Sequence, residues 1–160
     1  MPNIEIRQAT GSDAGLILRY ITDLAIYEKA GHEVLASESD IRESLFGPDS
    51  TAKALICNIN QQPVGYAIYF YNYSTWLAKP GLFLEDLYVT PEARGTGAGK
   101  ALLKHLAKIA VAKGCGRFEW NVLDWNEPAI QFYKSLGATP QDEWVGYRMT
   151  GEALEKLASS

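Results

Sequence analysis

In the first third of the chain, apolar residues recur first at every second position and then at the spacing of a helix. Alternation over residues 4–7 predicts an opening strand, and apolar residues at helical spacing over residues 16–29 predict a helix. A shorter helix, capped by Ser37 or Ser39, is predicted to end just before Pro48. One strand and two helices are therefore expected before residue 50.

The rest of the chain places two strands together and then alternates strands with helices. Two β-rich runs, 52–59 and 64–73, are joined by a short polar segment and predict a hairpin. The second run is apolar on both faces, so we expect it to be central in its sheet. The remaining expected elements are a strand at 82–89, a helix at 97–113, a strand at 117–123, a helix at 127–136, a strand at 144–149 and a short C-terminal helix. This order predicts an α+β (mixed α/β) fold around one central sheet.

The apolar pattern of the strand at 82–89 slips by one residue. Its apolar positions are even-numbered up to Leu84 and odd-numbered from Leu87 onward, and the slip falls on Glu85 and Asp86. A β-bulge at these two acids would return the apolar side chains to one face. The alternative is a strand that is buried on both faces and has no bulge.

Composition and charge limit the number of domains and the kinds of partner that this chain can have. The 160 residues are 47% hydrophobic, which suits one core, so we expect a single domain over residues 1–160. A net charge of −4 argues against nucleic acid as a partner. The start of the chain does not resemble a secretion signal, and no apolar run approaches membrane-spanning length, so we expect a cytoplasmic protein. Cys57 and Cys115 lack the spacing of a disulfide framework or a metal site.

Residues 94–100, Arg-Gly-Thr-Gly-Ala-Gly-Lys, stand where the helix at 97–113 is predicted to begin. Small residues before a helix N-terminus let backbone N–H groups approach a phosphate. A triphosphate-binding loop would need glycine at Arg94 and serine or threonine at Ala101, and the glycine spacing also differs from that of a dinucleotide fold. Two interpretations remain: a pyrophosphate cradle that needs no metal, or a turn that packs a helix closely on a sheet.

Two motifs in this order resemble those of the GNAT N-acetyltransferase superfamily. Residues 89–99 resemble its acetyl-coenzyme A motif, Arg/Gln-x-x-Gly-x-Gly/Ala, and residues 126–133 resemble its second motif, Asn-x-x-Ala/Ser-x-x-x-Tyr. The resemblance spans residues 4–154 and is nearest to the diamine acetyltransferase branch, which includes the spermidine/spermine and thialysine acetyltransferases. The segments that indicate this branch are residues 24–28, 73–76, 84–89 and 123–126.

The resemblance implies the GNAT acyl-CoA N-acyltransferase fold, a mixed, mostly antiparallel sheet with a bulged strand and helices on both faces. It also implies acetyl-CoA as cofactor without a metal, a small-molecule amine as substrate and a homodimer. In this superfamily the pantetheine arm pairs with strand backbone, as an added strand does. The residues implied to bind the cofactor are Leu87, Tyr88, Val89, Arg94, Gly95, Thr96, Gly97, Ala98, Gly99, Lys100, Asn126 and Ala129.

Tyr133 and Glu85 are the residues implied to be catalytic. Tyr133 follows Asn126 and Ala129 along one face of a predicted helix, and a phenol can donate a proton to a departing thiolate. An alkyl ammonium has a pKa of about 10.4, so Glu85 would take the proton that blocks attack by the amine. A core role for Tyr133 and a solvated surface charge at Glu85 are the alternatives.

The acceptor pocket implied by the resemblance consists of Tyr27, Glu28, Ser74, Trp76, Glu85 and Asp86. Polyamine-specific members carry aspartate where this chain has Ser74, which favours a shorter amine such as thialysine, lysine or ornithine over spermidine. Gly146-Tyr147 replaces the branch's Gly-Trp, so the resemblance does not identify the residues that form the far wall of this pocket. We expect direct attack in a ternary complex, because neither cysteine has a histidine nearby in the sequence to activate it.

Three rival functions share part of this pattern. A polyamine acetyltransferase would use the same two motifs, and a protein N-terminal or lysine acetyltransferase would need an open groove. The aromatic residues between 69 and 76 favour a closed groove, although they also suit a core or a dimer interface. A nonenzymatic acyl-CoA-binding module would keep the glycine loop but would not need Tyr133 or Glu85.

Overall fold

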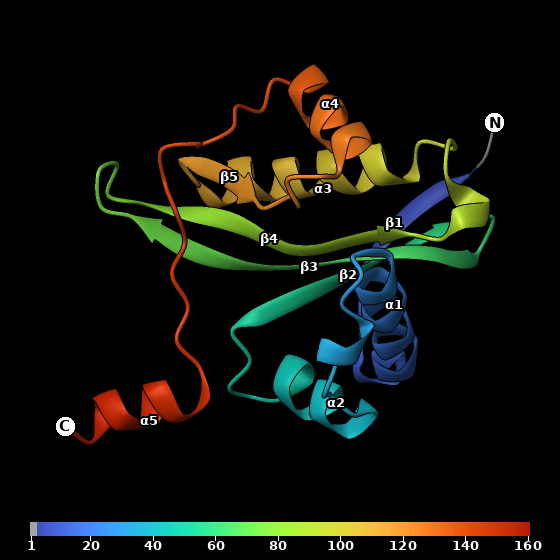
Figure 1. The fold of residues 1–160 in the computed structure, drawn as a ribbon. Coiled ribbons are helices and arrows are strands. Elements are labelled where there is room, and N and C mark those ends of the chain that lie inside the picture. The colour runs from blue at the N-terminus through green and yellow to red at the C-terminus, as the bar shows by residue number, and fades with distance from the viewer. Residues whose placement is uncertain (1–2) are drawn as a thin grey trace. The chain divides into compact units, whose positions relative to one another are not determined.

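Five strands form one sheet in the order β1-β2-β3-β4-β5, the same as their order along the chain (Figure 1). The first four pair antiparallel and β5 pairs parallel with β4. Their bounds are β1 Ile4–Gln8, β2 Ala52–Ile59, β3 Gln62–Ser74, β4 Lys79–Val89 and β5 Arg117–Trp120. The predicted hairpin is confirmed: β2 and β3 are joined by a tight turn in which Asn60 and Gln61 adopt positive φ angles. The strand β3 is central, as its apolar character on both faces predicts.

The computed structural model describes residues 3–160, which fall into two compact units, Met1–Asn121 and Val122–Ser160. The first unit contains the whole sheet and the helices α1 to α3. The second contains α4 and α5.

Helices cover both faces of the sheet in the first unit (Figure 1). On one face lie α1 (Ala14–Tyr27) and α2 (Glu38–Phe46), and on the other lies α3 (Ala98–Lys113). Short 3₁₀ turns η1 (Gly11–Asp13), η2 (Gly31–Glu33) and η3 (Pro91–Ala93) connect these elements. The predicted cap of α2 is formed by Ser37, whose Oγ accepts from Asp40 N–H at 3.1 Å while Asp40 Oδ2 accepts from Ser37 N–H at 2.9 Å.

The predicted bulge in β4 is confirmed. Ile68 of β3 pairs with Asp86 and the next residue, Tyr69, pairs with Leu84, so Glu85 is the extra residue. Pairing with β3 continues beyond the bulge to Val89, whereas pairing with β5 ends at Leu84. The second half of β4 is therefore paired on one edge only among the strands that the structure describes.

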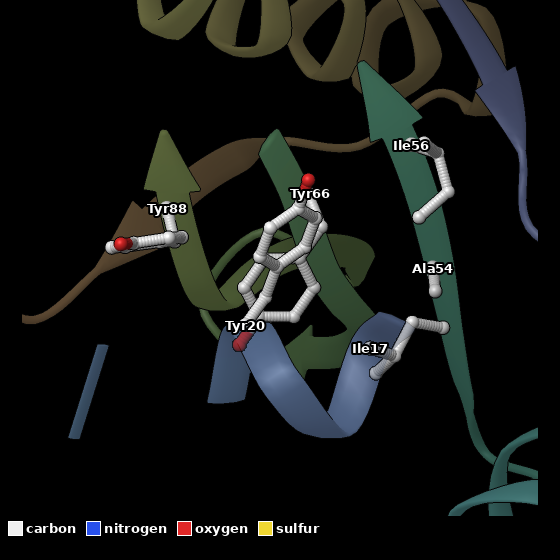
Figure 2. Close-up of a cluster of buried hydrophobic side chains, with 6 residues drawn as sticks. All are labelled: Ile17, Tyr20, Ala54, Ile56, Tyr66 and Tyr88. Atoms are coloured by element: carbon white, nitrogen blue, oxygen red, sulfur yellow. The ribbon is translucent and has the colours of Figure 1, made fainter. Parts of the chain in front are cut away.

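Three tyrosines dominate the core beneath α1. Tyr20 of α1 packs against Tyr66 of β3 and Tyr88 of β4, with ring centroids 5.6 Å and 5.7 Å apart (Figure 2). Aliphatic side chains complete this cluster: Ile17, Ala54 and Ile56. Tyr20 and Tyr66 are almost completely buried, so the second half of β4 and the start of β3 are fixed against α1.

Two predicted strand segments differ from the structure. Residues 144–149 form no strand, although their alternating pattern predicts one, and β5 ends at Trp120 rather than at residue 123. A strand needs a partner edge for its backbone groups, and the described part of the second unit contains only the helices α4 (Glu127–Ser135) and α5 (Gly151–Ala158). The prediction of a strand at 144–149 was therefore wrong.

Candidate active site

Three carboxylates gather at the bulge of β4. Glu85 is the bulged residue, Asp86 follows it, and Glu28 is the C-cap residue of α1. Burial raises the pKa of Glu28, and the negative charges of Asp86 and then Glu85 raise it further. These acids therefore act on one another electrostatically, which suits a site that receives a cation.

Asp86 is held by a buried tyrosine. The hydroxyl of Tyr66 donates a hydrogen bond to Asp86 Oδ2 at 2.5 Å. Burial raises the pKa of Asp86, and this hydrogen bond opposes the rise. Burial, and then the charge of Asp86, raise the pKa of Tyr66, so the phenol keeps its proton and serves as the donor. Tyr66 is not among the site residues predicted from the sequence.

The missed signal lies in the pairing of two strands. Tyr66 pairs with Tyr88, and Asp86 stands two residues before Tyr88 in β4, so Tyr66 and Asp86 are diagonal neighbours on one face. Which residues are diagonal depends on the bulge and on the length of the β3–β4 turn. The spacing of residues along the chain therefore could not reveal this contact.

The glycine loop ends on the N-terminus of α3. Gly95 and Gly97 have φ angles of 82° and 92°, which favour glycine, and Gly97 is the N-cap residue of the helix. The Oγ1 of Thr96 donates to the carbonyl of Ala93 at 2.5 Å and fixes the turn. The N–H of Ala101 donates to the carbonyl of Gly97 at 2.9 Å. It is the first rung of the helix, so the N–H groups of residues 98–100 are not used by the helix ladder.

The space in front of this helix end is open. A Cβ placed on Gly95 or Gly97 would meet no atom within 4 Å, and one placed on Gly99 would lie 3.8 Å from Cγ2 of Val89. The loop therefore adjoins the last residue of β4. Unused N–H groups, the positive end of a helix and open space are the features that bind a diphosphate. Between the two interpretations of the sequence, this geometry favours the cradle.

The backbone of Leu87, Tyr88 and Val89 leads up to the glycine loop. These residues pair with Ala67, Tyr66 and Gly65 of β3, while the pairing of β4 with β5 has already ended at Leu84. The Tyr88 side chain packs into the core. At the strand edge that does not pair with β3, Tyr88 can therefore offer a ligand only its backbone groups. An extended ligand can add to a strand edge of this kind.

Arg94 and Tyr27 connect the glycine loop to the end of α1. The guanidinium carbon of Arg94 lies 5.4 Å from the centroid of the Tyr27 ring, a cation–π contact. A shallow hollow of about 450 Å³ opens beside them. Its lining residues are Asp23, Ile26, Tyr27, Tyr88, Thr90, Pro91, Glu92 and Arg94. Tyr27, Glu28 and the loop thus lie around one end of the first unit.

Ser74 and Trp76 are not brought to the carboxylates within the chain. Ser74 ends β3, pairs with Lys79 and accepts a hydrogen bond from Leu77 N–H at 3.2 Å. Lys79 and Asp86 are separated by seven residues of strand, which span about 23 Å at a rise of about 3.3 Å per residue. Trp76 is 77% exposed in the same turn, where the guanidinium of Arg117 lies 5.7 Å from its ring.

The second unit carries the remaining predicted site residues on α4. Asn126 is the N-cap residue, its carbonyl accepts from Ile130 N–H at 3.0 Å, and Pro128 stands in the first turn. Ala129 and Tyr133 are four residues apart, so they share a helix face as predicted. Lys100, the last residue of the cradle, is exposed at the start of α3 in the first unit.

Residues 3–160 contain neither a metal-binding cluster of side chains nor a membrane-spanning helix. No three or more His, Cys, Asp or Glu side chains are grouped so that they could hold a metal ion. None of the helices in this range is both long enough and apolar enough to traverse a bilayer.

Known proteins match this chain over most of its length. An integron cassette protein from the mobile metagenome of V. cholerae has a similar structure, with a TM-score of 0.82 and 32% identity over 98% of both chains. Thialysine N-epsilon-acetyltransferase of Mus musculus is 40% identical over 99% of both chains. L-ornithine N5-acetyltransferase NATA1 of Arabidopsis thaliana is 30% identical over 95% of this chain and 86% of its own.

A family match agrees with these relatives. Residues 21–138 match the acetyltransferase (GNAT) family. The fold and the diamine acetyltransferase branch predicted from the two motifs are thereby confirmed. The same matches reject the nonenzymatic acyl-CoA-binding module as an alternative. The chain belongs to the acetyltransferase (GNAT) family and is an N-acetyltransferase.

Proposed function

We propose that the protein transfers an acetyl group from acetyl-CoA to a primary amine of a small molecule, by direct attack in a ternary complex. The acceptor is a thialysine-, lysine- or ornithine-like amino acid or a diamine. The observation that carries this proposal is that residues 85–89 of β4 join three carboxylates at the bulge to the open N-terminus of α3 beside Val89. The names of the relatives from Mus musculus and Arabidopsis thaliana support the acceptor class.

The residues at the end of β4 and the start of α3 fit coenzyme A. The unused N–H groups of residues 98–100 and the open space at Gly95 and Gly97 suit its diphosphate. The backbone at residues 87–89 suits its pantetheine arm, and Arg94 and Lys100 add positive charge. Asn126 and Ala129 of α4 complete the proposed cofactor set. When bound, acetyl-CoA would supply the acetyl group as an activated thioester, and coenzyme A would leave as the thiol.

Two side chains transfer protons in the proposed reaction, one as general base and one as general acid. Glu85 removes a proton from the acceptor ammonium, directly or through water, because only the free amine can attack a carbonyl carbon. Tyr133 holds a proton at its phenol oxygen for the leaving group. The proposal includes no acetyl-enzyme. Cys57 is unsuited to form one, because it is buried and burial raises the pKa of its thiol, which disfavours the nucleophilic thiolate.

The acceptor is bound by charge in this proposal. Glu28 interacts electrostatically with Asp86, and the two carboxylates attract an ammonium group. Tyr27 precedes Glu28 in the chain. Ser74 and Trp76 remain predicted substrate-binding residues, at the other end of the β3–β4 hairpin. Polyamine acetylation and protein N-terminal or lysine acetylation are the alternative functions.

We further propose that residues 1–160 act as one N-acetyltransferase domain that uses both Glu85 and Tyr133. A homodimer is expected from the resemblance to the diamine acetyltransferase branch, and a cytoplasmic location remains a prediction from the sequence. Sedimentation analysis of the purified chain would test the oligomeric state.

An amine panel tests the choice of acceptor. With acetyl-CoA constant and free thiol release as the measurement, thialysine, lysine or ornithine is expected to give a kcat/KM at least about tenfold above that of spermidine. The resemblance implies this preference, because polyamine-specific members carry aspartate where this chain has Ser74. A lysine-containing peptide serves as the protein-type substrate. A higher kcat/KM for spermidine or for the peptide would replace the proposed acceptor with that alternative.

A glycine pair tests the cradle. Gly97→Ala is expected to raise the KM for acetyl-CoA about tenfold or more, since the added methyl enters the space proposed for the diphosphate and strains a positive φ. Gly114→Ala is the matched control, because Gly114 ends the same helix with a φ of 78° and equally open space. Both variants should lose stability, but only the first should lose cofactor affinity. Equal cofactor KM values in the two variants would contradict the cradle.

A further inference from the structure

Tyr66 and Asp86 form a short side-chain hydrogen bond between neighbouring strands. The phenol oxygen lies 2.5 Å from Asp86 Oδ2, and Tyr66 itself is completely buried. The ring of Tyr66 is fixed by Tyr20, whose ring centroid lies 5.6 Å away at an interplanar angle of 35°. The donor is therefore held by the core, and it holds the carboxylate in turn.

The partner carboxylate belongs to the acidic group at the bulge. Charged or titratable side chains near Asp86 come from three elements: Glu28 from the end of α1, Glu85 from the bulge of β4 and Tyr66 from β3. Of these, Tyr66 donates to Asp86, while the two glutamates repel negative charge. Burial favours the neutral form of Asp86 and raises its pKa. The hydrogen bond from Tyr66 has the opposite effect, because it stabilises the charged carboxylate.

A second buried tyrosine lacks this connection. The hydroxyl of Tyr20 is buried and makes no hydrogen bond to a described residue. Figure 2 shows the hydroxyl groups of Tyr20 and Tyr66 at opposite ends of the ring pair. The packing of the two rings thus does not require a hydrogen bond, and the bond to Asp86 is a separate property of Tyr66.

We propose that Tyr66 is a positioning residue for the amine acceptor, whose hydroxyl engages Oδ2 of Asp86 and leaves Oδ1 to accept a hydrogen bond from the substrate's ammonium group. This inference rests on the proposed function, in which Asp86 contacts the amine. A carboxylate with one oxygen already engaged cannot rotate freely, so it presents a fixed acceptor to the incoming cation. Tyr66 then acts on substrate affinity without touching the substrate or the cofactor.

The test is Tyr66→Phe, which keeps the ring and removes the hydroxyl. The KM for the best amine of the panel is expected to rise about tenfold, because a hydrogen bond to a charged group is lost. The acid limb of the kcat/KM profile for that amine should move to higher pH, because Asp86 then binds its proton more tightly. The KM for acetyl-CoA should stay within about twofold of the wild-type value, as expected for a loss confined to the acceptor. An unchanged amine KM and an unmoved acid limb would overturn the inference, as would equal rises in both KM values.

Two further variants separate the possible failures. Tyr20→Phe removes a buried hydroxyl from the same cluster and should leave the amine KM and the pH profile as in the wild type, so any shared loss of stability can be subtracted. Asp86→Asn should raise the amine KM, and adding Tyr66→Phe to it should have little further effect. A wild-type amine KM in Asp86→Asn would contradict the proposed role of Asp86. A raised KM in Asp86→Asn beside an unaffected Tyr66→Phe would contradict only the positioning role.

Discussion

Replacing Tyr133 by phenylalanine is expected to lower kcat by about 10²-fold or more, the usual contribution of a positioned general acid. The phenol is proposed to supply a proton to the leaving group, and phenylalanine has none to give. The KM for acetyl-CoA should change little, because the proposed cofactor contacts lie in the glycine loop, in the backbone of residues 87–89 and at Asn126 and Ala129. Measuring kcat and both KM values by free thiol release checks this expectation.

The outcome for Tyr133 distinguishes a proton donor from a packing residue. Tyr133 lies in α4 with its ring centroid 5.8 Å from that of Phe132, so its ring also has a packing contact. Phenylalanine preserves that contact. Tyr20→Phe, a tyrosine outside the proposed machinery, should keep the wild-type kcat. If kcat and cofactor affinity fell by the same factor in Tyr133→Phe, the residue would be structural only.

Replacing Glu85 by glutamine is expected to lower kcat/KM for the amine by about 10²-fold at neutral pH. Glutamine cannot accept the proton, and on the order of one amine molecule in a thousand is unprotonated at pH 7 when its pKa is about 10.4. The deficit should therefore shrink as the pH rises toward the pKa of the amine, because more of the substrate arrives already deprotonated. The pH profiles of the wild type and the variant, recorded with one amine, provide the measurement.

The control for Glu85 is a glutamate away from the bulge. Glu43→Gln changes an exposed residue of α2 and should give wild-type profiles at every pH. A loss in Glu85→Gln that stayed constant across the pH range would indicate a role in binding or structure instead of proton removal. Wild-type activity at pH 7 would eliminate Glu85 as the base.

Local patterns predicted the elements whose signals lie within a few residues. The bounds of β2 match the predicted run at 52–59, the Ser37 cap begins α2 as expected, and the slip in apolar parity located the bulge at Glu85. In each case the information is carried by alternation or by a capping side chain. The run at 144–149 has the same alternation and forms no strand, because alternation describes one strand and pairing requires two.

The site was predicted less completely than the fold. The motifs led to the glycine loop and to the two acids of β4, and the described geometry places Glu28 with them. Tyr66 could not be identified, since its contact with Asp86 depends on how β3 and β4 align across a bulge. Ser74 and Trp76 were predicted together with the acids, but the 13-residue length of β3 places them at the opposite end of the hairpin. Distances that depend on strand length and alignment are not encoded in a short motif.

The extra residue in β4 reverses the alternation of side chains between the two faces of the strand. Before the bulge β4 is paired with both β3 and β5, and after it β4 is paired with β3 alone. Odd-numbered residues after the bulge point to the face that even-numbered residues occupy before it. A deletion at position 85 would therefore do more than remove a carboxylate: it would turn Asp86 away from Tyr66 and exchange the facing of every residue as far as Val89. Both the proposed acceptor site and the proposed cofactor site depend on the same extra residue, so neither can be altered there without the other.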